Sequence, residues 1–214
     1  GFAEWEQLVG GVDTLFKKSS DTVQAYAANA YKTAGLSANQ YMETVTSFSA
    51  SLLQGLKGDT EKSAQYAHMA VTDMADNANK MGTDIARIQD AYQGFAKDNY
   101  TMLDNLKLGY GGTAGEMARL VNETGVMGKG FKATAENVKD IPFDKLIEAI
   151  HKVQEKMGIT GTTAKEASET ISGSFYSMKA AWSNLVAGIG NEDISYDEIL
   201  GNFTSSIEVF LKNM

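Results

Sequence analysis

The feature that most constrains this chain is its proline content, with one proline against 21 glycines in 214 residues. Proline is the strongest breaker of a helix interior, so its near absence permits long helices. Glycine must then separate them, because it takes the left-handed conformation at helix ends with little steric cost. The sequence therefore predicts helices joined by glycine-containing turns.

Apolar residues recur at intervals of three and four along most of the chain, which indicates helices that bury one face. No segment shows a sustained alternation with the period of two expected of a strand. We therefore predict an all-α fold, an antiparallel bundle of helical hairpins with about seven to nine helices. The ranges with helical periodicity are 2–16, 23–34, 37–56, 60–81, 85–95, 113–121, 143–157, 163–189 and 195–211.

The most regular stripe is a short heptad seam in 64–81. Its members are spaced alternately by three and four residues, and they are Ala64, Ala67, Val71, Met74, Ala78 and Met81. Such spacing is typical of helices that pack side by side, and small alanines let two backbones approach closely.

Helix ends are predicted from capping residues. The spacing of a capping box, with Ser or Thr three residues before Glu or Gln, occurs at Ser37/Gln40, Thr113/Glu116, Thr163/Glu166 and Ser195/Glu198. A glycine followed by an apolar residue ends helices at Gly35-Leu36 and Gly158-Ile159. Gly82-Thr83 is expected to end one helix and cap the next, and Pro142 suits a first helical turn.

Residues 109–115 contain four glycines in seven positions, which is too costly in backbone entropy for a helix interior. We predict a hinge there, between an N-terminal helical half (1–108) and a C-terminal one (116–214). One continuous helical domain is the alternative.

Charge and composition exclude several classes of function. The chain has 19 basic and 27 acidic residues, for a net charge of −8, which disfavours sequence-specific binding of nucleic acid. It has no cysteine, which excludes disulfides, Cys-ligated zinc and a cysteine nucleophile. No apolar run reaches the ~18–20 residues that span a bilayer. The first residues show neither an initiator Met nor a signal peptide, so we expect an internal piece of a longer protein.

The two histidines are interpreted as structural. His68 lies one position past Ala67 on the seam and is predicted to be a surface or seam-edge residue; His151, beside Lys152, is predicted to lie on a solvated helix face. Neither has the spacing of a zinc-binding helix motif. We predict no catalytic, cofactor-binding or metal-binding residue, no cofactor, and no enzyme.

The other candidate functional residues are also explained by structural roles. Acids at a helix start are favoured by the helix dipole, which accounts for Asp193, Asp197 and Glu198 without glycoside cleavage. Gly109-x-Gly111-Gly112 has neither a preceding strand nor a following Gly-Lys-Ser/Thr, so a hinge explains it better than a phosphate loop. Most of the ten methionines, and Trp182, are expected in the core rather than at a partner surface.

Several stretches resemble the tail tape measure proteins of long-tailed bacteriophages and prophages. They extend over about three quarters of the chain and are 34–41 (AGLSANQY), 51–59 (SLLQGLKGD), 69–82 (MAVTDMADNANKMG), 158–167 (GITGTTAKEA), 170–174 (TISGS) and 179–185 (KAAWSNL). The chain departs from the family in one respect, since rod-like stretches have long uninterrupted heptads and only 64–81 has one here.

The resemblance implies a structural and assembly module in the virion, in the tail lumen, and in the host cytoplasm during assembly. It implies roles in tail length and DNA delivery, with the tail tube protein, assembly chaperones and the baseplate or tail-tip hub as partners; self-association through helices is also compatible. An acidic chain suits a lumen through which DNA passes. The lack of long uninterrupted heptads favours a folded module over a segment whose own length sets the tail length.

Two alternatives belong to other classes. A secreted helical-hairpin effector or secretion substrate would carry a Trp-x-Gly turn, but Trp182 is followed by Ser183-Asn184. A cell-wall hydrolase accessory domain would be revealed by clearing of a peptidoglycan suspension.

Overall fold

The computed structural model describes residues 1–170. Within this range the chain is helical, with turns and loops between the helices, which confirms the all-α class and the expected number of helices. The helix at 195–211, most of the one at 163–189, and the candidates Trp182, Asp193, Asp197 and Glu198 lie outside the described residues.

Eight α-helices and three 3-10 helices follow one another in residues 1–156. They are α1 (Phe2–Phe16), η1 (Lys17–Ser19), α2 (Ser20–Ala28), α3 (Ala30–Thr33), α4 (Ala38–Gly55), α5 (Thr60–Met81), α6 (Ile85–Ala96), η2 (Leu103–Leu106), α7 (Ala114–Thr124), η3 (Val138–Asp140) and α8 (Phe143–Lys156). Residues 162–170 are helical as well.

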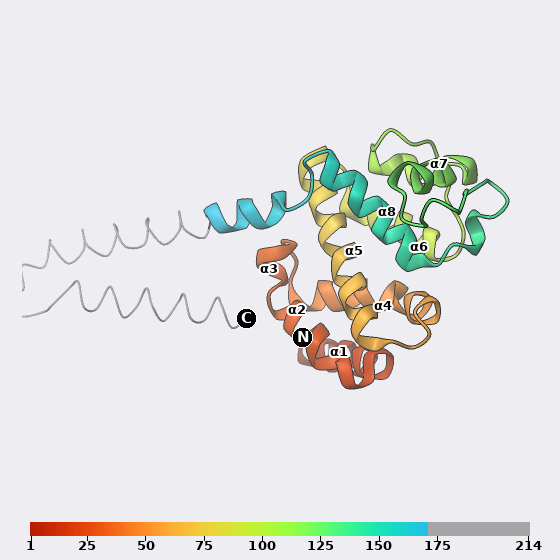
Figure 1. The fold of residues 1–214 in the computed structure, drawn as a ribbon. Helices are drawn as coiled ribbons and strands as arrows, with labels where there is room; N and C mark the ends of the chain where they lie inside the picture. Colours follow the sequence, from red (N-terminus) through yellow and green to blue (C-terminus); the bar gives the residue numbers. More distant parts are fainter. Residues whose placement is uncertain (171–214) are drawn as a thin grey trace, which may run out of the picture.

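Helix α5 is the centre of the arrangement. It packs against α1, α2, α4, α6 and α8. Figure 1 shows α8 beside it, with α1 and α4 towards one end of the molecule and α7 towards the other. One hydrophobic core extends from Val12 in α1 to Ile159 after α8. Helices before and after residues 109–115 therefore share that core within the described part of the chain.

The heptad seam of α5 is buried over its first part. Ala64, Ala67, Val71 and Met74 are buried, whereas Ala78 and Met81 are half-buried. After Met74, the buried residues of α5 include polar ones, which are described below. Of the other methionines expected in the core, Met42 and Met117 are buried and Met157 is exposed.

Two kinds of predicted helix end are confirmed. Ser37 Oγ accepts from the Gln40 amide at 3.1 Å, and the Ser37 amide donates to Gln40 Oε1 at 3.0 Å, a complete capping box. Gly158 is left-handed (φ 73°), and the next residue, Ile159, folds back into the core with its amide on Gln154 O at 2.9 Å.

Three predicted caps are wrong in detail. Thr83 does not cap α6, because Asp84 accepts the Ala86 amide there. Thr113 does accept from the Glu116 amide, but the Glu116 carboxylate accepts from Gly111 instead of completing a box. Thr163 Oγ1 has no hydrogen-bond partner, so the predicted box with Glu166 does not form. Only at Thr163 does a side chain from a distant segment, Asp76, accept from the backbone amide instead.

The glycine loop 109–115 is hydrogen-bonded to side chains of α7. Arg119 Nη2 donates to Gly109 O at 2.8 Å, and the Gly111 amide donates to Glu116 Oε1 at 3.0 Å. A Cβ on Gly112 would lie 2.3 Å from Thr101 O, a backbone atom. The glycine at 112 is thus required by a close approach of two chain segments.

We expect Gly112→Ala to lower the free energy of unfolding by about 1–3 kcal/mol, since the backbone at Thr101 must shift to admit a methyl group. Gly10→Ala is the matched control. A Cβ at Gly10, in the exposed middle of α1, meets nothing within 4 Å, so this change should stabilise the helix by up to about 1 kcal/mol. Urea denaturation measures both, and equal effects of the two substitutions would contradict the close approach.

Candidate functional site

The most unusual feature of the described chain is a group of buried polar side chains on α5. Asp73, Asp76 and Asn77 have relative exposures of 1%, 3% and 0%. Together with His151 and Gln154 of α8 they are called here the polar cluster. Burying such groups is costly unless each finds a partner. Each of the three α5 residues has a hydrogen-bond partner on another segment of the chain.

Asn77 joins three segments to α5. Its Nδ2 donates to Leu106 O at 2.9 Å and to Gln154 Oε1 at 2.8 Å. Its Oδ1 accepts from the Thr83 hydroxyl at 2.7 Å. Gln154, itself fully buried, donates from Nε2 to Asp73 O at 3.0 Å. Both amide hydrogens of Asn77 and its oxygen are therefore used, and the bonds join α5 to the turn before α6, to η2 and to α8.

Asp73 and His151 form an ion pair across α5 and α8. His151 Nδ1 donates to both carboxylate oxygens at 3.0 Å, while Nε2 faces the exposed Glu155 at 3.4 Å. Burial raises the pKa of Asp73 to about 6, against the opposing effect of His151. The hydrogen bond to Asp73 raises the pKa of His151, against the opposing effect of burial.

The prediction that His151 lies on a solvated helix face is wrong. Its side chain is 23% exposed, and its partner Asp73 is 1% exposed. The sequence places Lys152, Glu148 and Glu155 near His151, whereas Asp73 is 78 residues away. The structure brings this pair together because α8 packs along α5.

Asp76 uses both carboxylate oxygens on the chain that follows α8. Oδ2 accepts from the Gly161 amide at 2.8 Å, and Oδ1 accepts from the Thr163 amide at 3.0 Å. These amides belong to the start of the helical residues 162–170. Helix N-termini leave such amides without partners inside the helix, so a carboxylate there acts as a cap.

His68, expected at the surface or the seam edge, is half-buried between two tyrosines. Its ring stacks on Tyr26 with centroids 4.0 Å apart and planes 9° apart, and its Nδ1 lies 2.6 Å from the Tyr41 hydroxyl. Burial lowers the pKa of His68. The ring therefore joins α2, α4 and α5 as a packing element at the edge of the seam.

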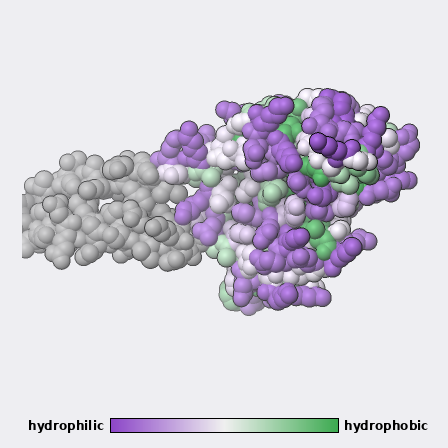
Figure 2. Space-filling view, in the orientation of Figure 1, coloured by the Kyte–Doolittle hydropathy of each residue, from purple (hydrophilic) through white to green (hydrophobic). Residues whose placement is uncertain are grey.

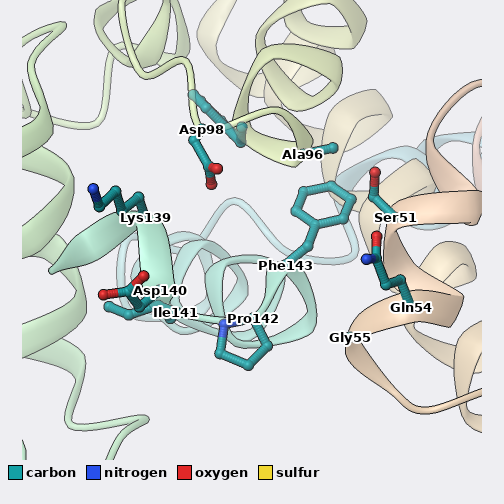
Figure 3. Close-up of a pocket in the computed structure, with 11 residues that line it drawn as sticks. Ser51, Gln54, Gly55, Ala96, Asp98, Lys139, Asp140, Ile141, Pro142 and Phe143 are labelled. Carbon is teal, nitrogen blue, oxygen red and sulfur yellow. The ribbon is translucent and has the colours of Figure 1, made fainter.

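A pocket of about 390 Å³ lies where α4, the end of α6 and the start of α8 meet. Asp98 and Lys139 lie on one side of it and Ser51 and Gln54 on the other, with the Phe143 ring between them (Figure 3). That ring also packs edge-on against Phe48, 5.8 Å between centroids. The pocket thus combines charges of both signs with a hydroxyl and a carboxamide, and this mixture points to no particular class of ligand.

The surface offers few large apolar groups. Figure 2 shows a mostly hydrophilic face with small apolar areas. The most exposed large apolar side chain in residues 1–170 is Phe2, which stacks on the exposed Trp5 near the start of α1 with centroids 6.0 Å apart.

The contacts of the polar cluster join helices and turns of the described chain. Within residues 1–170, no hydrogen bond joins His151 to a hydroxyl that it would activate as a nucleophile. The buried Tyr92 hydroxyl has no partner, and burial, followed by the charge of Asp73, raises its pKa well above the ordinary value. No group of three His, Asp or Glu in the described range is placed to hold a metal ion.

The polar cluster was missed at the sequence level, although one signal points to it. Asp73 and Asn77 follow Ala70 at three and seven residues, the spacing of one helix face. Polar residues that continue an apolar stripe in this way indicate buried positions that need partners. Apart from Thr83, six residues after Asn77, their partners lie 29 to 81 residues away along the chain and have no local signature.

Comparison with known proteins adds no family. No protein-family model, curated protein or solved structure matches the chain. None of the helices described in residues 1–170 combines the length and the apolar character needed to cross a membrane.

Proposed function

We propose that the chain is a structural and assembly module of a bacteriophage tail tape measure protein. The observation that supports this most is where the family-like stretches fall in the fold. Residues 34–41 contain the left-handed Gly35 and the capping box of α4. Residues 69–82 contain the polar cluster of α5 and its left-handed end, Gly82. The resemblance thus involves residues that define helix ends and buried contacts.

The module is proposed to act as a folded body and not as the ruler. Its longest described helix, α5, has 22 residues and is about 33 Å long. A straight helix of all 214 residues would measure roughly 320 Å. In this proposal the body lies in the tail lumen, contributes to assembly and DNA delivery without catalysis, and contacts the tube protein, assembly chaperones or the tail-tip hub.

The test is an in-frame deletion of residues 1–214 from the gene of the parent phage, with tail lengths measured by electron microscopy. A folded module predicts tails of unchanged length, or failure of assembly. The control is an equally long deletion in a heptad-rich part of the same gene, which should shorten tails by about 1.5 Å per residue.

Three results would contradict the proposal. Tails shortened by roughly 320 Å after deletion of this segment would make it part of the ruler. If mass spectrometry of purified virions detects the major tail proteins but no peptide of this chain, the chain lies outside the tail. Steady clearing of a peptidoglycan suspension by the purified chain would reveal an enzyme.

A further inference from the structure

Residues 162–170 form a helix that extends away from the rest of the molecule (Figure 1). Thr162, Thr163 and Ala167 are half-buried, and the other residues of this helix are exposed. Its contact with the remainder of the described chain is therefore concentrated in the first turn, where the methyl group of Thr163 lies near Gly35.

The turn before this helix does not fix its direction by itself. Gly158 and Gly161 are left-handed, with φ 73° and 86°, and between them Ile159 is buried in the core. Glycine adopts φ values of either sign at similar cost. The chain is thus anchored at Ile159, and Gly161 leaves open where the helix after it points.

Asp76 supplies the missing constraint from another helix. Its two oxygens accept from the amides of Gly161 and Thr163, at 2.8 and 3.0 Å. A local cap is lacking, because Thr163 Oγ1 has no partner. A carboxylate at a helix N-terminus is also favoured by the helix dipole. One side chain of α5 thereby satisfies and orients the first turn of a helix more than 80 residues downstream.

We propose that Asp76 is a latch. Its two hydrogen bonds hold the helix 162–170 against the body formed by α1 to α8, and their rupture frees that helix while the body stays folded. The body does not depend on this contact, since α8 is joined to α5 separately through Asp73, Asn77 and their partners. The inference rests on these contacts and is independent of the proposed function.

Hydrogen exchange at single amides in the full chain tests the latch. In Asp76→Ala the amides of Gly161 and Thr163 should exchange about 10- to 100-fold faster, because bonds to a charged acceptor are lost. Asp76→Asn keeps one acceptor oxygen and should give an intermediate rate. Amides inside α4 and α8 should keep their protection in both variants.

Asp59→Ala is the matched control. Asp59 is an exposed aspartate that caps α5 itself by accepting from the Lys62 amide at 3.0 Å. Its replacement should speed exchange at Lys62 and leave Gly161 and Thr163 unchanged. Unchanged exchange at Gly161 and Thr163 in Asp76→Ala would overturn the proposal.

The wild-type chain provides a second measurement should Asp76→Ala fail to fold. At low denaturant the amides of Gly161 and Thr163 should exchange through an opening that depends on denaturant much less than the opening at Val71, inside α5. Identical denaturant dependence at all three amides would show that they open only when the body unfolds. That result would make Asp76 a core residue and overturn the latch.

Discussion

Replacing Asn77 by alanine is expected to lower the free energy of unfolding by about 3 kcal/mol or more. Asn77 is fully buried and bonds to Leu106 O, Gln154 Oε1 and the Thr83 hydroxyl. The substitution leaves these three groups without their partner at a site from which water is excluded. The cost of an unsatisfied buried group exceeds the net gain of an ordinary hydrogen bond, so this change should be among the most damaging in the chain.

Urea denaturation followed by circular dichroism measures this loss. Asn79 is the matched control, because it lies on the same helix two residues further on and is exposed. Asn79→Ala should alter stability by no more than about 0.5 kcal/mol. A loss below about 1 kcal/mol in Asn77→Ala would show that the bonds of Asn77 do not hold α5, η2 and α8 together.

The second large effect is a dependence of stability on pH that comes from Asp73 and His151. The pKa of Asp73 is raised from 3.8 to about 6 in the folded chain, so the folded state binds this proton more tightly than the unfolded state. Its contribution to stability is fully present at low pH and declines as the pH rises from about 4 to about 6. The shift corresponds to about 3 kcal/mol.

His151 changes stability in the same direction. Its pKa is raised above the ordinary 6.5, so its contribution is complete below that value and is lost as the pH rises through the folded pKa. The charged groups that act on the pair are Asp76 on α5 and Glu155 on α8. Both partners of the pair therefore lower the free energy of unfolding as the pH rises from 4 to 8.

Asp73→Asn removes the titrating carboxyl and keeps an acceptor for His151 Nδ1. Relative to the wild type, the variant should gain about 3 kcal/mol of stability between pH 4 and pH 8. Urea denaturation at a series of pH values measures this difference. Asp90→Asn, an exposed aspartate on α6, controls for the loss of any carboxylate. Parallel profiles for the wild type and Asp73→Asn would contradict the buried ion pair.

The helices were predictable because they depend on local signals. Apolar spacing placed α1, α4, α5, α6 and α8, and the left-handed Gly35, Gly82 and Gly158 end helices where they were expected to. Helix caps were less predictable, since a side chain from elsewhere can replace the local one. Thr163 shows this clearly, because its amide bonds to Asp76, 87 residues earlier in the chain.

The polar cluster was harder to predict from the sequence for a related reason. Taken one by one, Asp73, Asp76 and Asn77 are residue types typical of a solvated face, and their partners lie mostly on α8, on η2 and in the turn at 161–163. Periodicity identifies which side of a helix is apolar. It does not identify a carboxylate whose partner is supplied by a distant segment, and the interpretation of His151 was wrong because its partner was unknown.

The long separation between Asp76 and Thr163 also has a consequence for synthesis on the ribosome. Helix α5 emerges early, while the amides that donate hydrogen bonds to Asp76 lie 85 and 87 residues later. At ~5–20 residues per second, the ribosome needs roughly 4–17 s to translate that interval. Throughout it, Asp76 lacks its partners, and the partners of Asp73 and Asn77 on α8 become available only towards its end. The turn at residues 161–163 is therefore the last to supply partners to the buried polar side chains of α5.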